Sequence, residues 1–354
     1  LESDGDDDIL AGIGSDIDPT DISASGIVKD GAIYLHDCNT RTGPFPYCRY
    51  MRHGVFSVTK SLGAAIAMQR LAQKYGQGVY DLKLADYVDI QAGHDGWTGV
   101  TFGDALDMAT GVGDSQPRPL EPNVMHGDED RPKFDNFLVA DSAESKLAIA
   151  FDYNNYPWPP GTIARYNSIN TFLLSAAMDA FLKEKEGPKA DIWDMVVEEV
   201  YRPIGVQHAP IMRTVEPDGN RGLPIFGYGL YPTVDELAKI TTLLQNGGVH
   251  NGQQLLHPGK LAKDLYQTDV TGYPAGQPNE LGQYRYNASY WGMPYQDQGG
   301  DVSYVPYMMG FGGNLVALVP NGTTAFRFAD AHNYDVASLV RAAGELVPFP
   351  DPSQ

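Results

Sequence analysis

Apolar and polar residues follow a helical period in several stretches of the 354-residue chain. In residues 57–75 the apolar positions lie three or four apart, and Gly76 is suited to end the helix that this pattern predicts. The same period predicts a helix in residues 233–248, where Thr233 and Glu236 form a capping box. Further helices are expected in residues 168–185, 190–205 and 335–347.

Strand patterns occur near both ends of the chain. Residues 26–36 alternate between apolar and polar side chains, with Asp30-Gly31 at the position where a hairpin would turn. Two more strands are indicated in residues 313–320 and 323–330.

The middle third of the chain has a different character. Short helical stretches alternate there with loops rich in Pro, Gly and Asp, and the longest loop lies near residues 113–134. We therefore expect an α/β domain formed by residues 1–81 and 226–354, with a mainly helical domain of residues 82–225 inserted into it.

The charge balance disfavours two classes of partner. The chain has 45 acidic and 25 basic residues, a formal net charge of -20. Nucleic acid and anionic membranes attract clustered Lys and Arg, so neither is an expected partner. No run of about 18 apolar residues occurs, so no membrane span is expected. The acidic opening, "LESDGDDDILAGIGSDIDPTD", is interpreted as the solvated start of a trimmed product, with calcium binding as the alternative.

The only two cysteines, Cys38 and Cys48, bracket the segment "NTRTGPFPY". The Pro and Gly residues between them favour a turn, which would bring the two sulfurs together. We expect a disulfide and hence a secreted or periplasmic protein whose signal peptide has been removed. Two unrelated thiols are the alternative.

A candidate catalytic pair stands at the start of the first predicted helix. Ser57 and Lys60 form the only Ser-x-x-Lys pattern in the chain. Residues three apart share a helix face, so the amine can reach the hydroxyl. Burial lowers the pKa of a lysine and allows it to take the serine proton near neutral pH. The serine N–H at a helix start is also free to stabilise an oxyanion. By itself, the pattern equally fits a helix cap beside a solvated lysine.

Five segments in chain order carry a family resemblance: "FSVTKSLGAAIAM" (56–68), "GVTFGDALDMATGVGD" (99–114), "WPPGTIARYNSINTFLLSAAM" (158–178), "LLQNGGVHNGQQLL" (243–256) and "GFGGNLVALVP" (310–320). Together they resemble the serine β-lactamase-like superfamily, which includes class C β-lactamases, D-alanyl-D-alanine peptidases, family VIII esterases and 6-aminohexanoate-oligomer hydrolases. The resemblance runs from about residue 27 to 345. It implies an antiparallel sheet flanked by helices, with Ser57 as the nucleophile and Lys60 as its base.

The resemblance also implies roles for four other residues. Tyr166 would hydrogen-bond Ser57 and Lys60 and pass a proton to the leaving group. Ser168 stands where the family often has the Asn of Tyr-x-Asn. Besides Asn167, Asn170 is the other amide side chain nearby. Gly310 and Phe311 would supply the strand N–H that completes the oxyanion hole.

The chain departs from the family at the strand that usually carries Lys-Thr-Gly or His-x-Gly. Here Met308 or Met309 takes the basic position, and no Lys, Arg or His occurs between Tyr286 and Val319. Penicillins and peptide C-termini should therefore bind weakly, unless Arg221 or Arg285 supplies the charge from a distant loop. The aromatic segments "YNNYPW", "YRYNASYWG" and "SYVPY" predict a pocket for apolar acyl or aryl groups.

Other catalytic classes lack their motifs. There is no Gly-x-Ser-x-Gly, no His-Glu-x-x-His and no Gly-rich phosphate loop, and "MHGDEDR" is interpreted as a polar loop. No metal and no cofactor are expected, and the oligomeric state stays open. Three functions remain: a hydrolase of small-molecule esters or unusual amides, a D-amino-acid peptidase or β-lactamase, and a binding or scaffold protein that kept the fold without turnover.

Overall fold

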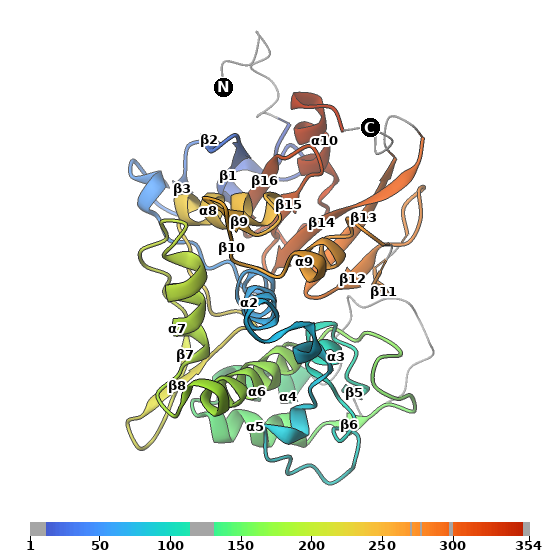
Figure 1. Ribbon diagram of the computed structural model, residues 1–354. Coiled ribbons are helices and arrows are strands. Elements are labelled where there is room, and N and C mark those ends of the chain that lie inside the picture. The colour runs from blue at the N-terminus through green and yellow to red at the C-terminus, as the bar shows by residue number, and fades with distance from the viewer. Residues whose placement is uncertain (1–11, 114–130, 270, 277, 297–299, 350–354) are drawn as a thin grey trace.

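An antiparallel sheet forms one end of the molecule (Figure 1). The computed structural model describes residues 12–113, 131–269, 271–276, 278–296 and 300–349. In order across the sheet, its eight strands are β11 (Tyr273–Pro274), β12 (Arg285–Asn287), β13 (Tyr290–Gln296), β14 (Val302–Gly310), β15 (Asn314–Leu318), β16 (Thr324–Ala329), β1 (Ile22–Lys29) and β2 (Ala32–Leu35). Strand β1, from the start of the chain, pairs with β16 from near its end. The expected antiparallel sheet built from both ends of the chain is confirmed.

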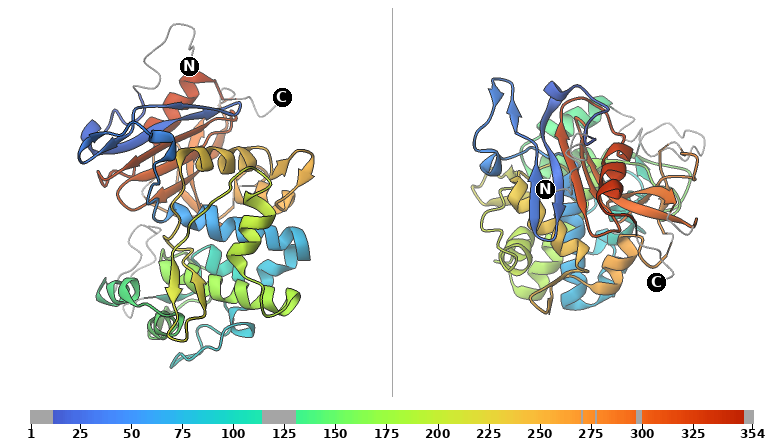
Figure 2. Two further views of the ribbon diagram at one scale, coloured as in Figure 1. Left: turned by 90° about the vertical axis from the view of Figure 1, so that its left-hand side faces the viewer. Right: turned by 90° about the horizontal axis from the view of Figure 1, so that it is seen from above.

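Helices lie on both faces of the sheet and beyond one end of it (Figures 1 and 2). The α-helices are α2 (Ile66–Tyr75), α3 (Phe102–Leu106), α4 (Arg131–Val139), α5 (Ala143–Phe151), α6 (Ser168–Glu186), α7 (Ile192–Val196), α8 (Val234–Gln245), α9 (Pro258–Asp264) and α10 (Ala337–Leu346). Two π-helical segments, η3 (Lys60–Ala65) and η7 (Val197–Tyr201), join α2 and α7 respectively. Single 3-10 turns are η1 (Pro19–Asp21), η2 (Cys48–Tyr50), η4 (Gln77–Asp81) and η5 (Leu84–Asp86).

Four two-stranded sheets complete the described structure. They pair β3 (Asn39–Thr40) with β4 (Gly43–Pro44), β5 (Val112–Gly113) with β6 (Asn154–Asn155), β7 (Arg213–Val215) with β8 (Arg221–Pro224), and β9 (Val249–His250) with β10 (Gln253–Gln254). The acidic opening up to residue 11, most of the long loop near 113–134 and nearly all of "MHGDEDR" lie outside the described residues.

The period-2 alternation of the strands divides the core in two. On β16, Phe326 faces the core shared with α2, α6 and α8, whereas Ala325 faces the core shared with α10. On β15, Val316 and Leu315 divide in the same way. Burial of apolar surface on both faces makes the sheet the centre of the upper part of the molecule in Figure 1.

The middle of the chain is mainly helical, as its pattern indicates, and α3 to α7 gather at the end of the molecule away from the sheet (Figures 1 and 2). One apolar core includes Phe172 of α6, Ile66 of α2 and Phe326 of the sheet. Because the two regions share this core, the division at residues 81/82 and 225/226 stays a prediction.

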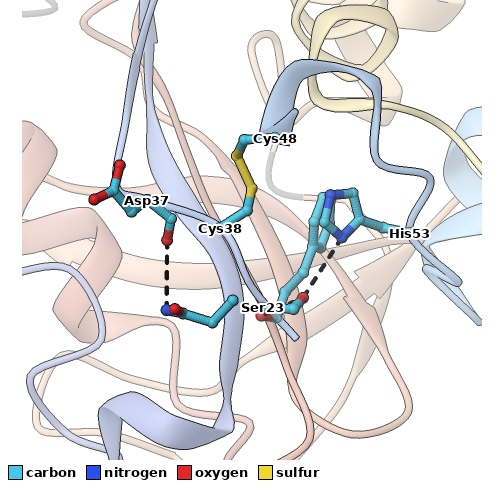
Figure 3. The surroundings of a disulfide bond; sticks show 7 residues. Ser23, Asp37, Cys38, Cys48 and His53 are labelled. Atoms are coloured by element: carbon cyan, nitrogen blue, oxygen red, sulfur yellow. Dashed lines mark hydrogen bonds between the residues drawn. A yellow bond between two sulfur atoms is a disulfide. The ribbon is translucent and has the colours of Figure 1, made fainter. Parts of the chain in front are cut away.

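Local signals in the sequence are confirmed at several points. Asp30 and Gly31 form the turn between β1 and β2 with φ of 50° and 76°. Thr233 and Glu236 form a reciprocal capping box at the start of α8. The expected disulfide joins Cys38 to Cys48 beside the sheet, as Figure 3 shows.

The helix expected over residues 57–75 differs from a uniform α-helix. Ser57 lies in a turn, residues 60–65 form the π-helix η3, and regular α-helix begins only at Ile66. A Cβ on Gly63 would lie 2.9 Å from the Phe226 ring, so close packing against a neighbouring segment accompanies the wider turn. Such π segments recur at functional sites.

Candidate active site

Ser57 is held at the end of a tied-down segment. Before it, the Arg52 guanidinium donates to both carboxylate oxygens of Glu236 at 2.8 and 3.1 Å, and His53 N donates to Pro232 O at 3.0 Å. The His53 ring packs on Phe328 of β16, and burial lowers the pKa of His53 to about 4. These contacts fix the direction in which the chain enters the turn at Ser57.

The turn itself is strained. Phe56 has a φ of 46°, a left-handed conformation that a bulky side chain rarely adopts. Thr59 N donates to Phe56 O at 2.9 Å and Lys60 N donates to Ser57 O at 3.0 Å, which closes the turn into η3. Ser57 remains partly exposed, so its hydroxyl is accessible at the molecular surface.

Lys60 is buried directly beneath Ser57. The residue is only 1% exposed. Its Nζ atom lies 2.8 Å from Ser57 Oγ, 2.9 Å from Ser168 Oγ and 2.7 Å from Gly227 O. A carbonyl oxygen only accepts, whereas either hydroxyl can donate or accept. A neutral amine can therefore donate to Gly227 and Ser168 while its lone pair receives the proton of Ser57.

Ser168 lies at the start of a helix, where its Oγ is 2.9 Å from Lys60 Nζ. It is the first residue of α6, and Asn167 precedes it as the cap, accepting a hydrogen bond from Ile169 N at 3.0 Å. Asn170, the other amide considered, instead accepts a hydrogen bond from Thr110 Oγ1 at 3.3 Å. Ser168, which stands where the family often has an asparagine, thus lies within hydrogen-bond distance of Lys60.

Gly227 is a contributor that sequence reasoning missed. Its carbonyl accepts the hydrogen bond from Lys60, and a Cβ at this position would lie 3.3 Å from Ser168 Cβ. The segment "IFGYG" (225–229) has no motif of its own. Its two glycines among apolar residues are the only signal of a close backbone approach.

Tyr166 lies beside the lysine. The Lys60 Nζ is 4.8 Å from the centre of the Tyr166 ring, and this ring packs against Trp291 at 5.7 Å and Tyr286 at 5.9 Å. The preceding residue is anchored, because Arg165 N donates to Met108 O at 2.7 Å. The structure thus brings Tyr166 beside Lys60, which lies more than a hundred residues earlier in the sequence.

The last residue of strand β14, Gly310, lies against the turn that contains Ser57, which we call the nucleophile turn. A Cβ on Gly310 would lie 2.2 Å from Val55 O, so only glycine permits this approach. Strand β13 pairs with β14 only as far as Tyr307, which leaves the β13 side of residues 308–310 without a partner strand among the described residues. An open strand edge therefore adjoins Ser57.

Two backbone donors flank this open edge. Among the described residues, neither Ser57 N nor Phe311 N donates to a protein acceptor. The Phe56 and Phe311 rings, which belong to partly exposed residues, meet edge to face at 5.5 Å. Unpaired backbone N–H groups of this kind can stabilise an oxyanion when a reacting carbonyl lies between them.

The basic residue of related strands has no counterpart here. Met308 is fully buried against the core that includes α2, and Met309 packs on the other face. Arg221 forms an ion pair with Asp194, and Arg285 donates to Gly272 O at 3.0 Å. The two arginines considered from the sequence therefore both have partners other than Met308 and Met309.

The described residues contain no group of three or more His, Cys, Asp or Glu side chains arranged to hold a metal ion. Within the same residues, no helix has the length and apolar character needed to cross a bilayer.

Comparison with known proteins shows the family and the fold. The family model described as Beta-lactamase matches residues 24–340. The fold is similar to a penicillin-binding protein from Bacillus halodurans, with 17% identity, a TM-score of 0.63 and coverage of 95% of this chain and 99% of the other. It is also similar to a family VIII carboxylesterase (15% identity, TM-score 0.62, 96% of each chain). A class C beta-lactamase matches with 15% identity and a TM-score of 0.63, over 97% of this chain and 96% of the other. No curated protein sequence matches.

Proposed function

The chain belongs to the beta-lactamase family, and on that premise we propose that it is a serine hydrolase that cleaves a carboxylic ester or an unusual amide through an acyl-enzyme on Ser57. The observation that carries the proposal is the position of the buried Lys60 amine, 2.8 Å from Ser57 Oγ. A lysine that served only as a solvated helix residue would not be 1% exposed.

The proposed reaction has two halves. In the first, Ser57 Oγ attacks the substrate carbonyl carbon while Lys60 Nζ takes the hydroxyl proton, and the oxyanion is held by the N–H groups of Ser57 and Phe311. The tetrahedral intermediate then collapses, and the leaving group departs with a proton delivered through Tyr166. In the second half, water attacks the carbonyl carbon of the acyl-enzyme, one water proton passes through Lys60 to Ser57 Oγ as the acyl–oxygen bond breaks, and the acyl group leaves as a carboxylic acid.

Neutral substrates suit this site better than anionic ones. Met308 and Met309 carry no charge, so a substrate carboxylate would lack the ion pair that a basic residue provides. We therefore favour esters over penicillins and D-alanyl-D-alanine peptides. Turnover of benzylpenicillin faster than that of neutral esters of similar size would favour the peptidase or β-lactamase alternative instead.

Export from the cytoplasm is part of the proposal. The Cys38–Cys48 disulfide supports it, because disulfides persist in oxidising compartments. The secreted or periplasmic location is supported by this bond alone.

A fluorophosphonate probe tests the nucleophile. We expect the probe to label the wild-type protein and the control variant Ser303→Ala. Ser57→Ala should not be labelled, and its rate of ester hydrolysis should fall by at least about a hundredfold. Circular dichroism and thermal unfolding establish that both variants fold. Labelling of folded Ser57→Ala, or absence of labelling of the wild type, would refute the assignment and leave a scaffold function.

A further inference from the structure

A cavity of about 250 Å³ lies along the open edge of β14. Its walls include Tyr284, Trp291, Tyr307, Met309, Tyr334 and Asp335. Met309 is the residue before Gly310, which abuts the nucleophile turn, and Trp291 packs on Tyr166, which in turn lies 4.8 Å from the Lys60 amine. The cavity is thus a neighbour of the catalytic groups.

Four of the nine residues that line this cavity carry aromatic rings. Trp291 and Tyr307 are 6.3 Å apart between ring centres, and Tyr284 and Tyr307 meet nearly at right angles at 6.4 Å. The negative faces of Trp and Tyr rings attract cations, and a cage of such rings is the usual recognition device for ammonium groups.

One carboxylate completes the lining. Asp335 Oδ1 accepts a hydrogen bond from Ala337 N at 2.9 Å, at the start of α10, and Asp335 forms no ion pair with a described Lys, Arg or His. Asp335 is exposed and lines the pocket, and its charge adds to the effect of burial, which raises the pKa of both Tyr284 and Tyr307. The pocket therefore has a negative charge and aromatic walls, and no described basic side chain lines it.

We propose that this pocket binds a positively charged group of the substrate, so that the preferred esters or amides carry an ammonium group. The proposal rests on the proposed hydrolase function and adds a substrate class to it. A carboxylate in the same place would be repelled by Asp335 and would find no cation, which separates this site from one built for penicillins or peptide C-termini.

Isosteric esters provide the direct test, because they differ only in one charge. Choline esters are compared with 3,3-dimethylbutyl esters, and p-nitrophenyl 4-(trimethylammonio)butanoate with p-nitrophenyl 5,5-dimethylhexanoate. The first pair places the charge on the alcohol and the second on the acyl group. We expect kcat/KM to favour the charged member of at least one pair by about tenfold or more.

Asp335→Asn isolates the contribution of the carboxylate. Asparagine retains an acceptor oxygen for Ala337 N, so the start of α10 should be preserved. The ratio of kcat/KM for the charged ester to kcat/KM for its neutral isostere should fall by about fivefold or more. Glu345→Gln, an exposed residue at the end of α10, removes the same charge elsewhere and should leave the preference unchanged.

Binding of choline against its carbon isostere 3,3-dimethylbutan-1-ol, measured by calorimetry, separates this proposal from the hydrolase assignment. Preferential choline binding that weakens in Asp335→Asn supports the pocket even if no ester is hydrolysed. Ester hydrolysis without preference for the charged isosteres, together with equal binding of the two alcohols, would overturn the pocket proposal and leave the hydrolase intact.

Discussion

Lys60 has three oxygen neighbours and, when neutral, only two protons to donate. Gly227 O must accept one of them, and the geometry lets Ser168 accept the second. The remaining neighbour is Ser57, whose hydroxyl then points its proton at the lysine lone pair. A protonated Lys60 would instead donate to all three oxygens and have no lone pair for the nucleophile.

The rate should therefore fall on the acid side. Protonation of Lys60 removes the base, so kcat/KM is expected to decrease by about tenfold per pH unit below the pKa of the free enzyme. Lys60→Met, which keeps the stem without the amine, should lower activity by about a hundredfold or more across the profile. A constant kcat/KM between about pH 5 and pH 9, with chemistry rate-limiting, would contradict a lysine base.

A second residue-scale feature lies away from the catalytic groups. Asp264 is 4% exposed and accepts hydrogen bonds from Gln69 Nε2 at 3.0 Å and Tyr80 OH at 3.2 Å. Burial, assisted by the nearby Asp107 charge, raises its pKa to about 7. The folded state therefore keeps a proton that the unfolded chain releases at lower pH.

Asp264→Asn tests this linkage. Because the folded pKa is raised, the wild-type unfolding free energy should fall as pH rises from about 4 to 7 and then level off. The variant lacks this titration, so its stability relative to wild type should increase over that interval by an amount on the order of 4 kcal/mol, because the pKa is raised from 3.8 to about 7. Urea unfolding at several pH values measures it, with the exposed Asp269→Asn as the control. A pH-independent difference between variant and wild type would contradict the raised pKa.

At the scale of elements, the site depends on one strand end. Strand β14 ends at Gly310, where its backbone lies close to Val55 O, and the next residue, Phe311, packs its ring on Phe56, the neighbour of Ser57. Only one side of residues 308–310 is paired, to β15, so the other side can receive a substrate. Strand β13 stops short of this point, and that difference in strand length creates the open edge.

Gly310→Ala should misplace this strand end. The added methyl would lie 2.2 Å from a backbone oxygen, so β14 or the nucleophile turn must shift. A displacement of about 1 Å in a catalytic group can cost about a hundredfold in rate, and we expect kcat to fall by that order. Gly78→Ala, whose Cβ would meet no atom within 4 Å, should leave kcat unchanged. Wild-type kcat in Gly310→Ala would show that the approach is not required.

On the scale of the whole molecule, chain ends and interior segments are held together around the nucleophile. The disulfide links Cys38, just after β2, to Cys48, from which the chain runs on to Ser57. Arg52 then ties the same segment to Glu236, the residue that also caps α8. The nucleophile turn is thus fixed to the sheet and to a helix from the second half of the chain.

Removing the disulfide should lower stability. A cross-link between residues with a separation of 10 should contribute about 2–3 kcal/mol to the free energy of unfolding. Cys38→Ala/Cys48→Ala is expected to lose that amount under oxidising conditions, and reductant should destabilise the wild type but not the variant. Two free thiols found by mass spectrometry in protein from its native compartment would refute the bond in the working enzyme.

Much of the architecture follows from the sequence because its signals are local. The helical period, the Asp30-Gly31 turn and the Thr233–Glu236 capping box each act over a few residues, and the structure has all three. Ser57 and Lys60 are close for the same reason, since their separation along the chain is one turn.

Other features depend on contacts between distant segments, so only the tertiary structure decides them. The approach of Gly227 to Lys60, the end of the β13 pairing at Tyr307 and the position of Asp335 beside Trp291 each join residues more than fifteen positions apart. No periodicity or motif encodes which backbone oxygen meets a buried amine. Sequence therefore determined the elements and the closeness of Ser57 and Lys60, whereas packing decided the contact of Lys60 with Gly227 and the lining of the neighbouring pocket, because both arise where separate elements meet.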